Sequence, residues 1–258
     1  MNKGELDEYM CILKLIEIRQ NGGTLFSDKI ISLKSNGIEL NDLPNDLELN
    51  HHLLEDEVIN IANHCNFKKS PSNSKADIHI NDIGYSIKSV RSSPPAIVNH
   101  TARPGFVNVC ERIGVDISQL DSMIDEYWIK RKKRILKEDV RNDNNDSPFT
   151  NHSLYLKPIL NYFLFVGTGQ KDSLYPSSGI ILLDNPLDPE KWLLKNKEDA
   201  LDFFWRKLVF SLRSKKGMPS GYPHKMSKKA LINKSSVEKW TEFIDGDYRG
   251  ALHIRIGR

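Results

Sequence analysis

Residues 75–89 constrain the fold of this chain more than any other segment, because their pattern predicts a β-hairpin. Apolar and polar residues alternate on either side of an Asn-Asp-Ile-Gly stretch, which has the composition of a turn. If the loop contains an even number of residues, Asp77 lies opposite Lys88, and opposite residues of an antiparallel pair point to the same face. The sequence therefore predicts that an acid and a lysine share one face of the hairpin while isoleucines fill the other.

This Asp–Lys pair has two interpretations. Cross-strand ion pairs on a solvent-exposed face are common, and the short spacing of Asp77 and Lys88 is a weak motif by itself. The same arrangement also carries the catalytic groups of metal-dependent nucleases of the PD-(D/E)xK type, which place an Asp on one strand and an x-Lys element on the next. The residues beyond the hairpin favour the second interpretation.

A longer pattern runs through the stretches Ser86-Ile87-Lys88-Ser89, Pro94-Pro95, Ile97-Val98-Asn99 and Phe106. These stretches resemble the segment around the catalytic lysine of HpaII-type restriction endonucleases. The amino-terminal residues 2–15 and the closing residues 252–256 look like the first helix and the last strand of that family. Residues 112–200 carry no such likeness, Pro104-Gly105 stand where the family usually has Thr-Asn, and Ser86 replaces the usual acid two residues before the lysine.

The resemblance implies an α/β, restriction-endonuclease-like fold in which helices flank a mixed central β-sheet. Residues 1–258 would form a single nuclease domain, with the catalytic core in 1–120 and the rest completing the fold and contributing DNA-binding elements. The implied activity is that of a type II restriction endonuclease, which cleaves double-stranded DNA at a short palindromic site, with CCGG as the candidate sequence. Because a palindrome has two-fold symmetry, a homodimer is expected, and a cognate DNA methyltransferase is the expected functional partner.

The same resemblance assigns roles to the residues around the hairpin. Asp77 would be the main ligand of Mg²⁺, which prefers oxygen ligands, and the carbonyl of Ile87 would add a backbone oxygen. Lys88 would orient the attacking water or stabilise charge that develops on the phosphate. Ser86 ligates a hard cation less well than a carboxylate does. A second carboxylate must therefore come from elsewhere, or the metal keeps more water.

Three acids are candidates for this second carboxylate. Glu5 comes first, because it lies beside the apolar stripe of an expected amino-terminal helix; the alternative is that it only favours the helix terminus through the helix dipole. Glu111, downstream of Lys88 in an expected helix, is the second candidate. Glu57, in the expected helix 53–65, is the third.

Basic residues are unevenly distributed, although the net charge is only +3. Residues 130–137 contain six Lys and Arg, which form either a DNA-facing cluster or a solvated helix face. Residues 203–237 contain nine and no Asp or Glu, and a long acid-free stretch favours a polyanion-facing surface. The predicted DNA-binding residues are Arg91, Asn99, His100, Arg103, Lys130, Lys133, Arg213, Lys215, Lys216 and Lys225.

Composition indicates a soluble chain, with 39% hydrophobic and 28% charged residues. No apolar run approaches the length of a membrane span, and the amino terminus lacks the apolar core of a signal peptide. The three cysteines are scattered, and no Cys/His spacing suggests zinc. A cytoplasmic protein with buried thiols and no membrane partner is expected.

The pattern also predicts the main elements of secondary structure. Helices are expected at 3–19, 52–65, 119–138 and 199–212, an extended segment at 24–34, the hairpin at 76–90, and a loop with short helices at 91–120. Buried strands are expected at 160–166 and 179–183, and a final strand at 252–256.

Two other functions fit the same residues. A structure-specific DNA repair or junction-resolving nuclease of the same fold would cut by DNA shape instead of sequence. A non-catalytic DNA-binding protein with a decayed nuclease centre would bind DNA without metal and leave it intact. Ser86 keeps this last alternative open.

Overall fold

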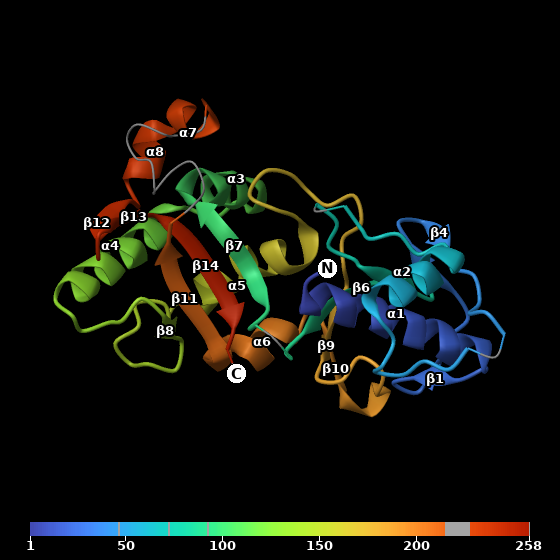
Figure 1. Ribbon diagram of the computed structural model, residues 1–258. Helices are drawn as coiled ribbons and strands as arrows, with labels where there is room; N and C mark the ends of the chain where they lie inside the picture. Colours follow the sequence, from blue (N-terminus) through green and yellow to red (C-terminus); the bar gives the residue numbers. More distant parts are fainter. Residues whose placement is uncertain (46, 72, 92, 215–227, 258) are drawn as a thin grey trace. The chain divides into compact units, whose positions relative to one another are not determined.

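The computed structural model describes residues 1–45, 47–71, 73–91, 93–214 and 228–257 (Figure 1). The chain divides into two compact units, each built from two separate segments. Unit 1 comprises Met1–Pro95 and Asp172–Ala200, and unit 2 comprises Ala96–Lys171 and Leu201–Arg258. The expectation of one nuclease domain with its catalytic core in residues 1–120 stays a prediction. The chain leaves unit 1 after the hairpin and returns to it later.

Unit 1 contains a six-stranded sheet in the order β10-β9-β6-β5-β3-β4. Its strands are β3 (Leu33–Ser35), β4 (Ile38–Glu39), β5 (Ile78–Ile80), β6 (Ile83–Ser89), β9 (Gly179–Leu183) and β10 (Trp192–Asn196). β6 and β9 run parallel and the other neighbours are antiparallel, so the sheet is mixed. The expected mixed α/β character is confirmed. A separate short hairpin pairs β1 (Thr24–Leu25) with β2 (Asp28–Lys29).

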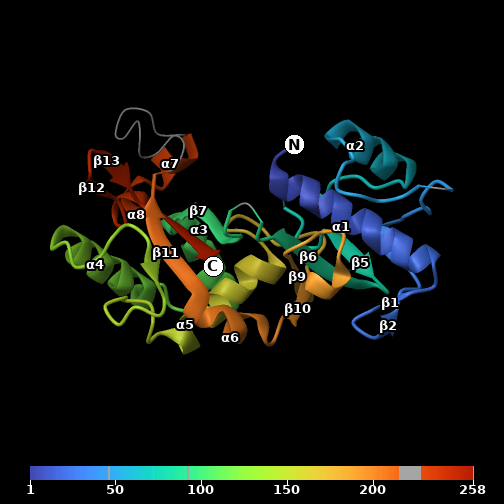
Figure 2. The same cartoon turned by 60° about the horizontal axis from the view of Figure 1, so that its bottom comes forward.

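Helix α1 (Lys3–Gln20) lies against β6, as both views show (Figures 1 and 2). Its apolar residues, including Cys11, Leu13 and Ile16, are buried in one core cluster with Ile78 and Ile87 of the hairpin. Helix α2 (Glu55–His64) packs on α1 and contributes Val58 and Ala62 to the same cluster. The amino-terminal end of α1 is thereby held near the hairpin.

The hairpin turns at two residues, Asn81 and Asp82, whose φ angles are 50° and 65°. A two-residue turn with positive φ at both central positions is the tight connection that twisted antiparallel strands favour, and Asn and Asp tolerate it well. Ile78 therefore pairs with Tyr85, and Asp77 falls level with Ser86 instead of Lys88. The predicted register was wrong by two residues because Ile83 and Gly84 belong to the strand and not to the turn. An even shift keeps the predicted face.

Unit 2 contains a four-stranded antiparallel sheet in the order β7-β14-β11-β8. Its strands are β7 (Ala96–Ala102), β8 (Val140–Arg141), β11 (Leu208–Arg213) and β14 (Ala251–Ile256), and β12 (Glu242–Ile244) pairs separately with β13 (Asp247–Arg249). Its helices are α3 (Arg103–Ile113), α4 (Ser118–Lys132), α5 (Ser153–Asn161), α7 (Lys228–Ile232) and α8 (Lys234–Glu238). Helix α6 (Ala200–Phe204) follows β10 where the chain re-enters unit 2.

Three predicted elements of unit 2 differ from the structure. Residues 160–166 are not a strand, because α5 continues into a π-helical turn at Tyr162–Val166. The predicted helix 199–212 ends early, and Leu208–Arg213 form β11 after the 3₁₀ turn Trp205–Lys207. Strand β7 occupies part of the expected loop 91–120. In the first two cases an apolar run fits both helical and strand periodicity, and tertiary packing decides between them.

In the described part of the chain, none of the helices combines the length and apolar character that crossing a membrane requires.

Candidate active site

Asp77 is the centre of a small polar site at the end of β6 in unit 1. Its Oδ2 atom accepts a hydrogen bond from the N–H of Ile87 at 2.7 Å and another from Ser86 Oγ at 3.3 Å. The Lys88 ammonium lies 3.4 Å from the same oxygen. The predicted convergence of Asp77 and Lys88 on one face is therefore confirmed. The two-residue turn sets this geometry, because it places Ser86 level with Asp77 and Lys88 diagonal to it.

Lys88 also donates to the carbonyl oxygen of Ile87 at 3.0 Å. Its ammonium thus lies between Asp77 Oδ2 and Ile87 O, the two atoms expected to ligate a metal. Both are hard oxygen ligands of the kind that Mg²⁺ prefers. The position already attracts a cation within the chain, so its ligand chemistry fits a magnesium ion.

Glu8 on α1 is the acid that sequence reasoning missed. Burial and, after it, the charge of Asp77 raise the pKa of this carboxyl to about 8, while the charge of Lys88 opposes the shift. A group shifted by burial and by a like charge beside it is typical of functional sites. The sequence signal was available, because Glu8 lies one helical turn after Glu5, beside the same apolar stripe.

None of the three acids predicted to supply the second carboxylate contacts Asp77 in the described part of the chain. Glu5 closes the capping box of α1, exchanging hydrogen bonds with Asn2 at 3.0 Å each way, and forms an ion pair with Lys69. Glu57 accepts from the N–H of Leu54 at 2.6 Å at the start of α2. These are helix-terminus roles, as the alternative for Glu5 proposed. Glu111 is exposed on α3 and belongs to unit 2, whereas Asp77 belongs to unit 1.

A second buried acid, Asp7, secures the end of β6 to α1. Its carboxylate accepts from Ser89 Oγ and forms an ion pair with Arg91 at 3.0 Å, with only 2% of the Asp7 side chain exposed. Arg91 was predicted to bind DNA. Its guanidinium is bound to Asp7 and about a third exposed, at 31%, so a structural contact accounts for its position and the DNA contact stays a prediction.

Lys75, two residues before Asp77, interacts electrostatically with Asp77 and Lys88. Burial lowers the pKa of this lysine to about 8, the charge of Lys88 adds to the effect, and the charge of Asp77 opposes it. Lys75 was not predicted to take part in the site, because nothing in its sequence context distinguishes it from other lysines of the loop before the hairpin.

The predicted DNA-binding residues of unit 2 are mostly engaged in internal contacts. Arg103 donates to both carboxylate oxygens of Asp121, at 2.7 and 2.8 Å, and to Ser236 Oγ at 2.7 Å. Lys130 pairs with Glu126 at 2.7 Å and donates to the carbonyl of Asp146. Among the predicted residues that the structure describes in unit 2, Asn99 on β7 and Lys133 after α4 are exposed to solvent. Residues Lys215, Lys216 and Lys225 lie outside the described residues.

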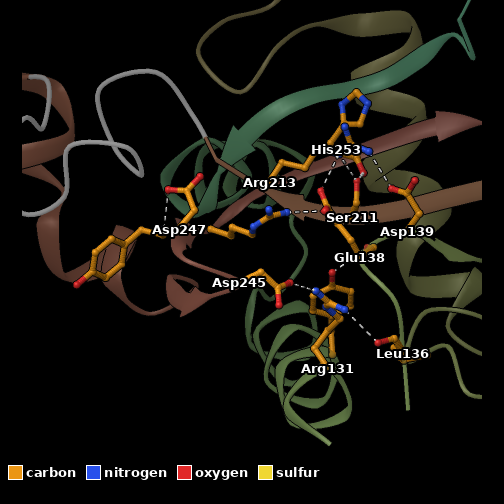
Figure 3. A network of polar contacts seen from close by, with 12 residues as sticks. Arg131, Leu136, Glu138, Asp139, Ser211, Arg213, Asp245, Asp247 and His253 are labelled. Carbon is orange, nitrogen blue, oxygen red and sulfur yellow. Dashed lines mark hydrogen bonds and ion pairs between the residues drawn. The ribbon is translucent and has the colours of Figure 1, made fainter. Parts of the chain in front are cut away.

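Arg213 belongs to a dense polar network on one face of the unit 2 sheet (Figure 3). It pairs with Asp139 at 2.8 Å and with Glu138 at 3.6 Å, while its Nε donates to Ser211 Oγ at 2.9 Å. Arg255 pairs with the other oxygen of Asp139 at 2.6 Å. Glu138 and Asp139 thus offset the charges of Arg213 and Arg255, and the DNA contact of Arg213 stays a prediction.

Two histidines border this network. The Nδ1 of His100 lies 3.1 Å from the carbonyl oxygen of Ser214, and its ring meets that of His253 edge to face at 4.7 Å. Burial and then the charges of His100 and the nearby arginines lower the pKa of His253 to about 4. His253 is therefore neutral near pH 7 and adds no charge for DNA. His100 has a φ of 42° where β7 bulges against β14.

Metal ligation at Asp77 involves few carboxylates. Within the ranges that the structure describes, no group of three or more His, Cys, Asp or Glu side chains is arranged to hold a metal ion. Asp77 Oδ2 and the carbonyl oxygen of Ile87 both contact the Lys88 ammonium, and the charge of Asp77 acts on the Glu8 carboxyl. Magnesium commonly uses one or two carboxylates and keeps several waters, so this donor set fits it.

Comparisons with models of protein families, with curated proteins and with solved structures found no match to this chain.

Proposed function

We propose that this chain is a magnesium-dependent nuclease that hydrolyses phosphodiester bonds of double-stranded DNA. The observation that carries the proposal is the convergence of Lys88, the Ile87 N–H and Ser86 on one oxygen of Asp77, with the high-pKa carboxyl of Glu8 beside them. Carboxylates that can hold a metal ion and a lysine that can stabilise phosphate charge suit metal-assisted phosphodiester hydrolysis. The mixed sheet beneath the site is compatible with a restriction-endonuclease-like fold.

In hydrolysis, a water oxygen bonds to phosphorus, the bond from phosphorus to the leaving sugar oxygen breaks, and that oxygen gains a proton. A magnesium ion held by Asp77, Glu8 and the Ile87 carbonyl would supply Lewis acidity and a more acidic water. The Lys88 ammonium would stabilise negative charge on the phosphate oxygens. The Ile87 N–H and Ser86 hold the Asp77 carboxylate in place.

The finer proposal is a type II restriction endonuclease acting at a short palindromic site, with CCGG as the candidate. It is supported by the resemblance of the segment around Lys88 and by the exposed Asn99 eleven residues further on, since Asn and Arg are typical readers of base edges. A homodimer and a cognate methyltransferase belong to the same proposal.

The test is cleavage of unmethylated plasmid DNA by the wild type and by Asp77→Asn, with and without Mg²⁺. We expect discrete fragments that require Mg²⁺, and a loss of rate of about a thousandfold in the variant, equivalent to about 4 kcal/mol of barrier. Asp82→Asn is the matched control, because it removes an exposed carboxyl from the turn of the same hairpin.

The products separate the competing functions. Discrete bands indicate sequence-specific cutting, whereas selective cutting of junctions or flaps would favour a structure-specific nuclease. A folded wild type that binds DNA but cuts none under any divalent cation would contradict the nuclease and leave the non-catalytic DNA-binding protein.

A further inference from the structure

The structure divides the six basic residues of the segment 130–137 into two groups. The first three form ion pairs at 2.6–2.7 Å, Lys130 within its own helix, and Arg131 and Lys132 with acids of the β12–β13 hairpin. Figure 3 shows the pair between Arg131 and Asp245. The charges of these three residues are therefore offset within the fold.

The other three basic residues, Lys133, Arg134 and Lys137, are exposed. In the part of the chain that the structure describes, their side chains form no ion pair or hydrogen bond. The acids that follow them, Glu138 and Asp139, pair instead with arginines of β11, β13 and β14. Three positive charges within five residues thus lack a counterion there.

The end of α4 fixes the backbone of this cluster. The N–H of Arg134 donates to the Arg131 carbonyl at 3.0 Å, and the N–H of Ile135 donates to the Lys130 carbonyl at 2.9 Å. These two bonds form a Schellman motif, in which Arg134 takes the left-handed conformation with a φ of 58°. Leu136 is buried, and its carbonyl accepts from the Arg131 guanidinium at 3.2 Å. The exposed cations therefore stand on an ordered turn.

An arginine in the left-handed position of this motif is unusual. That conformation crowds a β-carbon and favours glycine, and Gly114 takes it at the end of α3 with a φ of 68°. Arg134 gives up the stability that glycine would offer at this place. Residues held in such conformations are concentrated at functional sites, and no described residue contacts the Arg134 side chain in a way that explains the choice. A ligand from outside the chain would explain it.

We propose that Lys133, Arg134 and Lys137 bind phosphates of the double-stranded DNA backbone. The proposal takes its partner from the proposed nuclease function and adds a DNA contact in unit 2 to the Asp77 site in unit 1. Phosphate contacts fix the position of a duplex without reading its sequence. Unpaired cations on an ordered turn suit this contact, because each of them neutralises a phosphate and releases a condensed counterion.

The experiment measures binding of a labelled mixed-sequence duplex to the full chain by fluorescence anisotropy at several salt concentrations, with Ca²⁺ in place of Mg²⁺ to prevent cutting. Each phosphate contact contributes about 0.9 to the slope of log K against log salt. We expect Lys133→Gln and Lys137→Gln each to lower the slope by about 0.9 and to weaken binding about fivefold. Lys132→Gln is the matched control. It removes a neighbouring exposed charge that is paired with Glu242, so the slope should stay unchanged.

Arg134 allows binding to be separated from stability. Arg134→Gly should raise the melting temperature by about 2 °C, because glycine accepts the left-handed conformation, and should still lower the slope by about 0.9. Arg134→Lys should keep the slope of the wild type. A purely structural role in capping α4 predicts the reverse for Arg134→Gly, with a lower melting temperature and unchanged DNA binding, and that result would overturn the role of Arg134.

The remaining outcomes distinguish this proposal from the nuclease. If the wild type binds and cuts DNA and Lys133→Gln and Lys137→Gln keep its slope, the DNA contact is refuted and the nuclease stands. If Lys132→Gln lowers the slope as much as Lys133→Gln does, total charge alone is responsible and the proposed contact fails. If the slopes fall as expected but no divalent cation supports cutting, the contact stands and the nuclease fails. A wild type that neither binds nor cuts DNA would refute both.

Discussion

Glu8 in unit 1 and Asp121 in unit 2 are both acids set against the protein interior, yet their pKa values shift in opposite directions. Burial and the charge of Asp77 raise the pKa of Glu8 to about 8. Burial also acts on Asp121, but hydrogen bonds from Arg103, Lys239 and Trp240 outweigh it and lower the pKa. The three donors lie 2.7–2.8 Å from the Asp121 oxygens.

The contrast extends to the surroundings of each acid. Asp139 in unit 2 is likewise held ionised by Arg255 and Arg213 against the effect of burial. In unit 1, burial raises the pKa of Glu8, with the charge of Asp77 adding to the effect, and burial lowers the pKa of Lys75, with the charge of Lys88 adding to it. A buried charged group whose hydrogen-bond and ion-pair partners are all present in the fold stabilises the protein. A buried charged group that lacks such partners is a candidate for binding a ligand.

The largest expected effect on stability comes from removing the charge of Asp121, whose partners are all present in the fold. Asp121→Asn leaves Arg103 and Lys239 without their carboxylate, with the Asp121 side chain only 6% exposed. We expect a loss of about 3 kcal/mol of folding free energy, because removing one member of a buried pair strands the other. Urea denaturation checks this. Because the native pKa of Asp121 is lowered, the difference from wild type should shrink as the pH falls; a constant difference would show that the charge is not the cause.

The next effect, with the opposite sign, concerns Glu8. Between the ordinary pKa of 4.5 and the native value of about 8, the folded chain holds a proton that the unfolded chain releases. Rising pH therefore lowers stability across this window. We expect Glu8→Gln to gain roughly 1–3 kcal/mol relative to wild type between about pH 5 and about pH 8, less than the full shift because water reaches the carboxyl.

Glu5 provides the control on the same helix. Its pKa is lowered, chiefly by the hydrogen bond from Lys69, so its contribution to stability is present above the ordinary pKa and is lost as the pH falls. Glu5→Gln should therefore lose stability relative to wild type at neutral pH. A change in the free energy of unfolding with the same sign in both variants would contradict the contrast between Glu5 and Glu8. Added Mg²⁺ should stabilise the wild type at high pH and have little effect on Glu8→Gln.

The smallest effect is expected in the network of Figure 3. Asp139→Asn weakens the pairs with Arg213 and Arg255, but the Asp139 side chain is 43% exposed, so solvent screens much of the interaction. We expect a loss of about 1 kcal/mol that becomes smaller at high salt. Thermal melting at two ionic strengths measures it. A loss as large as that of Asp121→Asn would place these two acids in the same class.

The sequence predicts the local features that depend on alternation and turn chemistry. The hairpin, the shared face of Asp77 and Lys88, helix α1 and the strands β9 and β14 follow from such patterns. The hairpin register was wrong because Ile83 can end a turn or begin a strand, and the positive φ values of Asn81 and Asp82 decide between them. Leu208 and Leu212 fit a helical stripe from Leu201, yet they lie in β11.

The site was only partly predictable, because its second acid depends on tertiary packing. Glu5 and Glu8 lie one turn apart beside one apolar stripe, and the sequence cannot say which of them is the more strongly affected by burial and by the charge of Asp77. The capping box with Asn2 commits Glu5 to the helix terminus. The engagement of Arg103 with Asp121 and of Arg213 with Asp139 also comes from long-range contacts, which charge counts along the chain do not reveal.

The parallel pairing of β6 with β9 has a consequence for biosynthesis. Tyr85 of β6 pairs with Gly179, and the intervening chain builds much of unit 2 before it returns. During synthesis, the backbone groups on one edge of β6 would stay unpaired until β9 is made. Pairing between segments so far apart in the sequence slows folding and leaves an aggregation-prone strand edge exposed in the nascent chain. Aggregation of the unfinished chain through this edge should therefore lower the yield of folded protein.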